Sequence, residues 1–229
     1  DEAHCISQWG HDFRKSYMQI PEFLKKINQN PVLAAFTATA TPLVREDIIK
    51  KLKLRNPKEF IKGFDRKNLN FSVVKGENST NFILNFLNKN ESSSGIIYAS
   101  TRKEVDRLYE LLKTKKYKVG KYHAGLTEKK RKHYQDEFIY ENLDLMVATN
   151  AFGMGIDKSN VRFVIHNNIP KDIESYYQEA GRAGRDGEDA QCILIFNPKD
   201  VMTQRYFIEN NEFSVSEEVK ESKYRKLQD

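Results

Sequence analysis

The chain has 229 residues and a formal net charge of +6, and 39% of its residues are hydrophobic while 31% are charged. These proportions exclude a disordered chain and allow a buried core, and no apolar run reaches the length of a membrane span. A modest basic excess suits a polyanionic partner, although many ordinary proteins carry one.

The two cysteines, Cys5 and Cys192, lie far apart in the sequence, and neither belongs to a CxxC pair. The sequence therefore indicates neither a zinc site nor a disulfide framework, and a reducing, cytoplasmic location is the default expectation. No signal peptide is apparent. Because the chain begins at Asp1, directly inside a motif, we expect it to be part of a longer protein.

The predicted elements begin with an apolar run over residues 31–36, which indicates a buried strand. Pro42 then indicates the start of a helix that ends near Leu52, because proline suits the first helical turn. The basic stretch from Lys53 to Lys67 indicates a boundary between two units.

Strands and helices alternate beyond this boundary. The expected strands cover residues 71–75, 95–99, 118–122, 143–149, 163–167 and 191–196, and the expected helices cover 80–88, 101–113, 127–139 and 173–180. This alternation predicts an open α/β fold with a mostly parallel sheet, whose ligands bind at the carboxyl ends of the strands. From Pro198 onward the sequence is highly charged and predicts a helical extension that packs on another part of the protein.

The first motif, Asp1-Glu2-Ala3-His4, places two carboxylates side by side. Phosphoryl transfer needs a carboxylate that holds Mg²⁺ and a group that orients the attacking water. Asp1 would hold the metal through water, and Glu2 would act as the base. A solvated acidic turn explains the same four residues, so the motif alone leaves both interpretations open.

An aromatic-rich segment follows at residues 7–14. Its rings offer surfaces for base stacking, and its arginine offers a contact for phosphate. The candidate residues are Gln8, Trp9, His11, Phe13 and Arg14. A core tryptophan flanked by polar residues is the alternative. Farther along, Thr37 and Thr39 would relay hydrogen bonds between two sites, although such residues at strand ends usually form turns.

Three further segments follow expected strands, at residues 98–102, 122–126 and 148–157. Hydroxyl groups and backbone N–H groups at the start of a helix bind anions, and glycines let the backbone approach a ligand closely. The candidate residues are Ser100, Arg102, His123, Thr149, Gly155 and Asp157. An ordinary helix cap, a structural histidine and a plain glycine turn are the respective alternatives.

Residues 178–187 read QEAGRAGRDG, with Gln178 at the start and two arginines three residues apart. On one helical turn, Arg182 and Arg185 would project the same way, and the small residues between them would allow another surface to approach. This pattern suits an arginine finger that neutralises charge on a transferring phosphate.

In this order and spacing, the segments resemble the later motifs of superfamily-2 helicases. They are DEAH at 1–4, TAT at 37–39, YAST at 98–101, ATNAFGMGID at 148–157 and QEAGRAGRDG at 178–187. The sequence resembles the RecQ family more specifically at SQWGHDFR (7–14), FDRKNL (64–69) and the block from 161 to 187. The resemblance extends from residue 1 to about residue 205.

The resemblance implies an ATP-dependent 3′-to-5′ DNA helicase acting in recombination and repair, which uses ATP and Mg²⁺ and binds single-stranded and forked DNA. Asp1 and Glu2 would serve the metal and the attacking water, and Arg182 and Arg185 would reach the nucleotide. The other implied nucleotide contacts are His4, Gly155, Asp157 and Gln178. The implied DNA contacts are Gln8, Trp9, His11, Phe13, Arg14, Ser100, Arg102, His123 and Thr149, while Thr37 and Thr39 would couple the lobes.

The same resemblance implies RecA-like lobes. Residues 1–65 would be the C-terminal part of the first lobe with the linker, 66–205 the second lobe, and 206–229 the helical start of a zinc-binding region whose ligands lie outside this sequence. Lys15 and Lys67 stand where the family often has proline. No GxxxxGK[ST] phosphate loop is present, so we expect the remaining parts of the parent chain to supply it and this chain alone not to hydrolyse ATP.

Two other interpretations stay open. The chain would act as a non-enzymatic module that binds single-stranded DNA through basic loops, which steep weakening by salt would reveal. Alternatively, it would belong to an RNA helicase of the same superfamily, although the aromatic segment argues against RNA.

Overall fold

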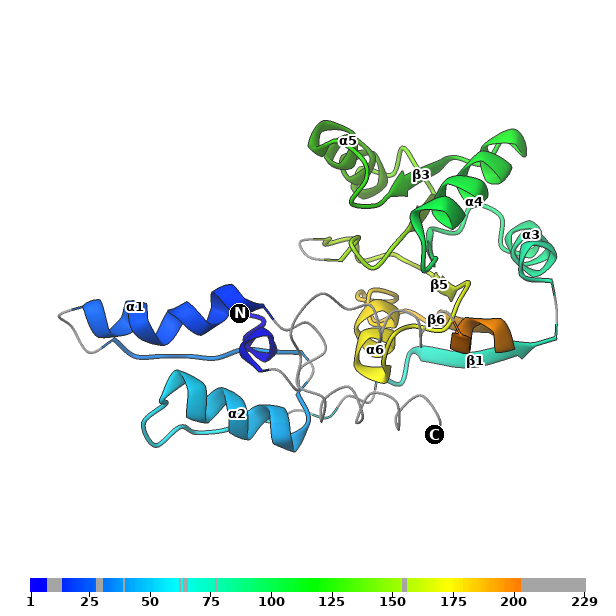
Figure 1. The fold of residues 1–229 in the computed structure, drawn as a ribbon. Helices are drawn as coiled ribbons and strands as arrows, with labels where there is room; N and C mark the ends of the chain where they lie inside the picture. The colour runs from blue at the N-terminus through cyan, green and yellow to red at the C-terminus, as the bar shows by residue number, and fades with distance from the viewer. Residues whose placement is uncertain are drawn as a thin grey trace. The chain divides into compact units, whose positions relative to one another are not determined.

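A computed structural model describes residues 1–7, 14–27, 31–38, 40–61, 63, 66–76, 78–153 and 156–202 (Figure 1). The expectations for Gln8, Trp9, His11, Phe13, Thr39, Gly155 and residues 206–229 lie outside this description. The chain divides into two compact units, whose described residues lie before Phe64 in the first and after Asp65 in the second.

The described part of the first unit is helical. It contains the 3₁₀ helices η1 (Ala3–Ile6) and η2 (Lys15–Gln19) and the helices α1 (Ile20–Lys26) and α2 (Pro42–Leu52). Helix α2 begins and ends where the sequence predicted, while η1, η2 and α1 were not predicted. A small core joins η1 to α2 and consists of Ala3, Ile6, Val44 and Ile48.

The prediction of a buried strand over residues 31–36 is wrong. These residues belong to no strand, and all six are exposed. The carbonyl of Phe36 accepts a hydrogen bond of 2.9 Å from the N–H of Ala3, which is a single contact with a 3₁₀ helix. An apolar run becomes a buried strand only beside other strands, and the described residues of this unit contain none.

The second unit is built on a six-stranded sheet in which every pair of neighbouring strands is parallel. The strands are β1 (Leu69–Lys75), β2 (Gly95–Tyr98), β3 (Val119–Tyr122), β4 (Leu145–Ala148), β5 (Phe163–His166) and β6 (Ala190–Phe196). Their order across the sheet is β1-β6-β5-β2-β4-β3. This arrangement confirms the predicted α/β fold with a parallel sheet.

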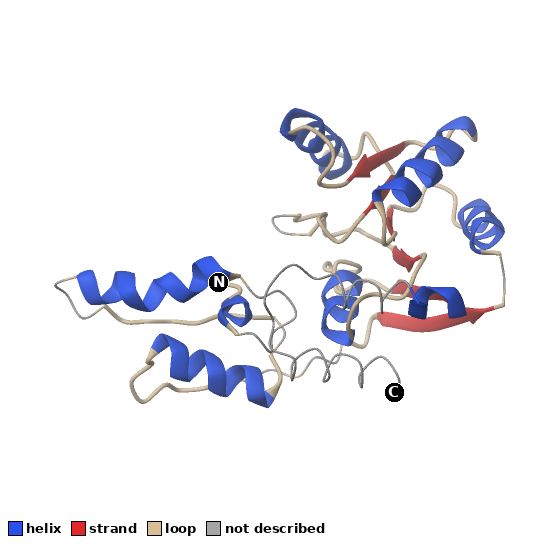
Figure 2. Ribbon diagram, in the orientation of Figure 1, coloured by secondary structure: helices blue, strands red, loops and turns tan. Residues whose placement is uncertain are grey.

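Helices cover both faces of this sheet (Figure 2). They are α3 (Ser79–Lys89), α4 (Arg102–Thr114), α5 (Glu128–Ile139) and α6 (Ile173–Ala180). Alternate side chains of each strand point to opposite faces. Ile97 therefore lies in the core with α3 and α4, while its neighbour Ile96 lies in the core that includes Phe138 of α5 and Ala180 of α6.

The six strands and four helices predicted between residues 71 and 196 all occur in this unit, and their ends differ from the prediction by at most two residues. The residue before each helix explains where the helix begins, because its side-chain oxygen accepts a hydrogen bond from a backbone N–H of the first turn. Thr101 does so for α4, Thr127 for α5 and Asp172 for α6.

The start of β2 has no room for a side chain. Gly95 pairs with Phe163 of β5, and a Cβ at Gly95 would lie 2.1 Å from two carbons of that fully buried ring. Gly95→Ala is therefore expected to lower the free energy of unfolding by about 1–3 kcal/mol, because a packed core resists an added methyl group. Urea unfolding measures the change.

Gly63→Ala is the control for this variant, because no atom of the described residues lies within 4 Å of a Cβ built there. We expect it to change the free energy of unfolding by less than about 0.5 kcal/mol. Equal effects of the two substitutions would contradict the packing explanation.

Candidate nucleotide and nucleic-acid sites

The acidic motif of the first unit lies at the start of η1. Asp1 is exposed, and its Oδ1 accepts a hydrogen bond of 2.9 Å from the N–H of Glu2. Glu2 adopts a left-handed backbone conformation with φ of 49°. Its Oε2 lies 3.4 Å from Nδ1 of His4, yet this buried oxygen accepts no hydrogen bond from any described residue.

His4 joins the acidic motif to the threonine motif. The imidazole is buried, and its Nδ1 lies 2.8 Å from Oγ1 of Thr37. The structure therefore brings together Glu2, His4 and Thr37, which the sequence analysis had chosen from two separate segments. A buried carboxylate oxygen without a donor fits a site that is completed by a water or a metal-bound water. Glu2 fits that description, and the exposed carboxylate of Asp1 precedes it directly in the chain.

The backbone of Arg14 contacts the helix that begins in this motif. Its N–H donates a hydrogen bond of 2.8 Å to the carbonyl of Cys5 in η1, and its side chain is half-buried. Close by, the Ser7 hydroxyl donates to Asp47 of α2 at 2.6 Å, and Asp47 also pairs with Lys51 at 2.8 Å. These contacts hold the start of the aromatic-rich segment against α2.

In the second unit, the predicted nucleic-acid contacts lie at the carboxyl ends of neighbouring strands. Ser100 follows β2, and its N–H donates to Oδ1 of Asn168 at 3.2 Å. Thr149 follows β4, and its N–H donates to the carbonyl of Tyr122 at 3.0 Å. The Thr149 hydroxyl accepts from the N–H of Ala151 at 3.4 Å, so this threonine caps its own loop.

His123, at the end of β3, has partners for both ring nitrogens. Its Nδ1 accepts a hydrogen bond of 3.2 Å from the N–H of Gly125, and its Nε2 lies 3.4 Å from Asp106. A hydrogen bond from Lys121 holds the pKa of the Asp106 carboxyl below its ordinary value, so this carboxylate stays charged. The buried His123 ring thus supports the loop that Arg102 lies against, as a structural histidine would, and its predicted contact with DNA stays a prediction.

A cavity of about 260 Å³ lies where β2 and β5 end. Its lining includes Ser100, Asn150, His166, Asn168, Lys171 and Glu179. His166 is buried between Tyr98 and Tyr176, and its Nε2 lies 2.8 Å from Oε2 of Glu179 on α6. Its Nδ1 is buried without a hydrogen-bond partner among the described residues. The sequence analysis missed this histidine–glutamate pair, which joins β5 to the end of α6.

Burial also sets the protonation of the aromatic groups around His166. It raises the pKa of the Tyr98 hydroxyl above its ordinary value and raises the pKa of Tyr176 to about 12. Both hydroxyls therefore stay protonated at neutral pH. The Tyr98 hydroxyl donates a hydrogen bond of 2.9 Å to the carbonyl of Phe152, which fixes the loop after β4 above the sheet.

The two arginines of the QEAGRAGRDG segment reach this same loop. The Nη1 of Arg182 donates to the carbonyl of Gly153, and the Nη1 of Arg185 donates to the carbonyl of Ile156 at 2.8 Å. Arg185 also lies 3.4 Å from the carboxylate of Asp157, which is itself almost fully exposed. The arginines therefore meet the loop that carries the predicted nucleotide contact Asp157.

The sequence had predicted that both arginines lie on one helical turn, and this prediction is wrong. Helix α6 ends at Ala180, and two consecutive turns carry Arg182 and Arg185. Gly184 between them has φ of 54°, and a Cβ there would lie 2.5 Å from Asn68 and 2.7 Å from a backbone oxygen. A residue other than glycine would thus be strained twice, by its backbone and by its neighbours.

Residues from the start of this unit brace the arginine turns. Arg66 donates to the carbonyls of Gly181 and Gly184, and Asn68 donates to Gly184 and Glu188. Both belong to the FDRKNL segment, which the sequence analysis used only as part of the family resemblance. Its role as a brace involves partners more than 100 residues away, and no local pattern indicates them.

Gln178, the remaining predicted nucleotide contact, lies half-buried on α6, one residue before Glu179. Among the described residues of the chain, no group of three or more His, Cys, Asp or Glu side chains is placed to hold a metal ion. None of the helices in the described part is long and apolar enough to cross a membrane.

Comparisons with known proteins give this geometry a family. Residues 78–187 match the family described as the helicase conserved C-terminal domain. The chain is 52% identical over all 229 residues to the ATP-dependent DNA helicase RecQ of Bacillus subtilis, of which it covers 39%. It is 46% identical over 212 residues to a putative ATP-dependent RNA helicase of Acanthamoeba polyphaga mimivirus, covering 92% of this chain and 38% of that relative.

A solved structure agrees with the fold. S. cerevisiae Dbp5 bound to RNA and ADP BeF3 aligns with a TM-score of 0.71 at 22% identity, over 99% of this chain and 62% of that chain. The parallel sheet, its covering helices and the arginine turns define a RecA-like helicase lobe. The chain belongs to the RecQ family of helicases. It spans about two fifths of the length of the Bacillus subtilis relative.

Proposed function

We propose that this chain forms the second motor lobe, and part of the first, of an ATP-dependent 3′-to-5′ DNA helicase of RecQ type that acts in recombination and repair in the cytoplasm. One observation carries the proposal. Arg182 and Arg185 both meet the loop after β4, and this loop connects Thr149 at the sheet end with Asp157. One short loop is therefore shared by the candidate nucleic-acid contact and the candidate nucleotide contacts.

The residues would divide the work as follows. Asp1 would hold Mg²⁺ through water, and Glu2 would orient the water that attacks the terminal phosphate of ATP. Arg185 would stabilise the charge that develops on that phosphate. Ser100, Arg102 and Thr149 would hold the DNA strand. The metal supplies charge neutralisation when it is bound, and the chain supplies the orientation of water and nucleotide.

A phosphate-release assay tests the enzymatic part. The chain alone is expected not to hydrolyse ATP with single-stranded DNA present, because its sequence has no phosphate loop to hold the nucleotide. A longer protein in which a phosphate loop precedes this chain is expected to hydrolyse ATP when single-stranded DNA is added. DNA-stimulated turnover by the chain alone, or none by the longer protein, would refute the proposal.

RNA is the competing substrate, because one of the relatives is named a putative RNA helicase. Binding of fluorescent single-stranded DNA and RNA of equal sequence and length separates the two. The proposal expects tighter binding of DNA, and a clear preference for RNA would replace DNA by RNA as the substrate. Binding without hydrolysis in the longer protein would leave a non-enzymatic binding module.

A further inference from the structure

Positive charge is concentrated at one end of the lobe. Residues 102–133 contain 12 lysines and arginines and 4 acids, which gives 12 − 4 = +8 in this stretch. The whole chain carries only +6, so the remainder of the chain has a net charge of −2. The stretch comprises α4, the edge strand β3 and the first half of α5, and the structure describes all of it.

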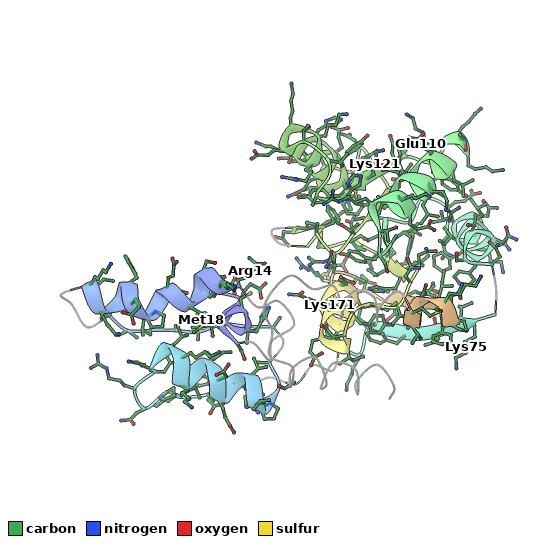
Figure 3. The ribbon with its side chains drawn as sticks, in the orientation of Figure 1. Arg14, Met18, Lys75, Glu110, Lys121 and Lys171 are labelled. Atoms are coloured by element: carbon green, nitrogen blue, oxygen red, sulfur yellow. The ribbon has the colours of Figure 1, made fainter. Side chains whose placement is uncertain are left out.

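The acids of this stretch do not neutralise it. Glu104 pairs with Arg107 at 2.7 Å, and Asp106 pairs with Lys121 at 2.6 Å where β3 lies between α4 and α5 (Figure 3). Glu110 and Glu128 are the two acids that remain. Several exposed lysines of the stretch therefore make no ion pair with any described residue, and they include Lys103, Lys129, Lys130 and Lys132.

One group of these cations gathers around the loop that follows β3. Arg102 lies against this loop, because a Cβ at Gly125 would be 3.2 Å from Arg102 Cδ. From the other side, Arg131 donates to the carbonyls of Ala124 and Leu126. The loop thereby joins the first turns of two helices. We call the exposed lysines of these turns the basic end of the lobe, and they are Lys103, Lys129, Lys130 and Lys132.

The basic end is suited to phosphates rather than to bases. Its stretch contains no fully exposed tyrosine, phenylalanine or tryptophan ring, because Tyr109 is buried and Tyr117 and Tyr122 are partly buried; the exposed imidazole of His133 lies at its end. Tyr122 packs against Phe152, with ring centroids 5.0 Å apart. Proteins that hold single strands generally stack bases on exposed rings, whereas backbone contacts need only mobile cations. A duplex, whose bases are hidden and whose phosphates face outward, matches this surface.

We propose that the basic end binds the phosphate backbone of duplex nucleic acid, beyond the strand-end loops that would hold the single strand. The proposal rests on the proposed function for its ligand class. It adds a second contact at the β3 edge of the sheet, which the duplex arm of a forked substrate would occupy. This binding would not depend on the base sequence, because lysines that contact phosphates do not distinguish base pairs.

A triple substitution tests the proposal in the chain itself. Lys129→Gln, Lys130→Gln and Lys132→Gln together remove three charges, and glutamine preserves the helix. Binding to a fluorescent blunt duplex, and separately to a single strand, is measured over a series of salt concentrations. The variant is expected to bind duplex at least about tenfold more weakly, with a salt slope lower by about 2 to 3. Its affinity for the single strand is expected to change by less than about threefold.

The matched control removes three exposed lysines elsewhere on the same unit, by Lys75→Gln, Lys89→Gln and Lys199→Gln. Lys75 lies on β1, at the opposite edge of the sheet (Figure 3). Both variants should melt at the wild-type temperature. The control is expected to keep duplex affinity within about threefold of wild type, because it leaves the basic end intact.

Several outcomes would overturn the proposal. The first is that the wild-type chain binds no duplex at low salt. The second is that the Lys129/Lys130/Lys132 variant binds duplex as tightly as wild type, and the third is that this variant and the control lose duplex affinity equally. Equal loss of polyglutamate binding and duplex binding would assign the surface to acidic protein segments instead. Failure of the wild-type chain to bind single strands would count against the proposed function, and the duplex comparison would still report on the basic end.

Discussion

Replacing Arg185 with alanine is expected to slow ATP hydrolysis about 1,000-fold in a helicase that contains this chain and a phosphate loop. The Arg185 side chain is 35% exposed, and a single nitrogen, Nη1, makes its hydrogen bonds within the lobe. The remaining nitrogens of its guanidinium make no hydrogen bond with any described residue, so a phosphate could bind them. The variant should keep the wild-type free energy of unfolding to within about 1 kcal/mol, because the group it loses is partly solvated.

Arg182 provides the comparison. Its side chain is buried and donates to the carbonyl of Gly153 in the loop after β4. Arg182→Ala would leave that carbonyl without its donor and open a space beneath the loop, so we expect a loss of about 2–4 kcal/mol in the free energy of unfolding. The two arginines have similar sequence surroundings, but we expect Arg185 to act on the nucleotide and Arg182 to stabilise the fold.

Steady-state hydrolysis with saturating single-stranded DNA and urea unfolding, applied to both variants, separate the two roles. Arg185→Ala should lose turnover at nearly constant stability, and Arg182→Ala should lose stability. Wild-type turnover in the Arg185 variant would remove it from the catalytic machinery. A large loss of stability on replacing Arg185 would show that both arginines are structural.

The sheet of the second unit could be predicted because its signals are local. Its central strands are short apolar runs such as 95–99 and 163–167, and both are buried in the structure. Thr101 and Thr127 mark helix starts through hydrogen bonds that span only three residues. Patterns of this range appear directly in a sequence.

The failures have a common physical cause, since each depends on partners far away in the sequence. Residues 31–36 have the composition of a strand, but composition does not say whether neighbouring strands exist. The arginine turns look like the continuation of α6, but Gly184 and its hydrogen bonds with Arg66 and Asn68 close them into turns. The His166–Glu179 pair likewise joins a strand to a helix, and single residues in a sequence do not indicate such a pair.

The sequence indicated where the candidate site lies, but it did not indicate which residues hold the site in place. Thr149 and Asp157 do lie in one loop at the end of β4, as their positions after an apolar strand indicated. What holds that loop was not predicted. The sequence analysis gave Phe152 no role. In the structure its ring is fully buried, and its carbonyl accepts a hydrogen bond from the Tyr98 hydroxyl.

Phe152→Ala is expected to destabilise the lobe by about 3–5 kcal/mol, because a large buried ring leaves a cavity when it is removed. The Phe152 ring packs against Tyr122 at 5.0 Å and Phe138 at 6.0 Å between ring centroids, so it joins β3 and α5 to the loop. Losing this anchor should also free the segment that carries Thr149 and weaken the binding of single-stranded DNA.

Urea unfolding and single-strand binding at a fixed low salt concentration measure the two effects. Ala151→Ser is the control, because it changes the adjacent, exposed residue of the same loop. Phe152→Leu should fall between wild type and Phe152→Ala, since leucine fills part of the cavity. If Phe152→Ala unfolds with a large loss of stability but binds the single strand as tightly as wild type at concentrations where it is folded, the loop is not the DNA contact. Thr149 would then act only as the cap that its hydrogen bond to Ala151 describes.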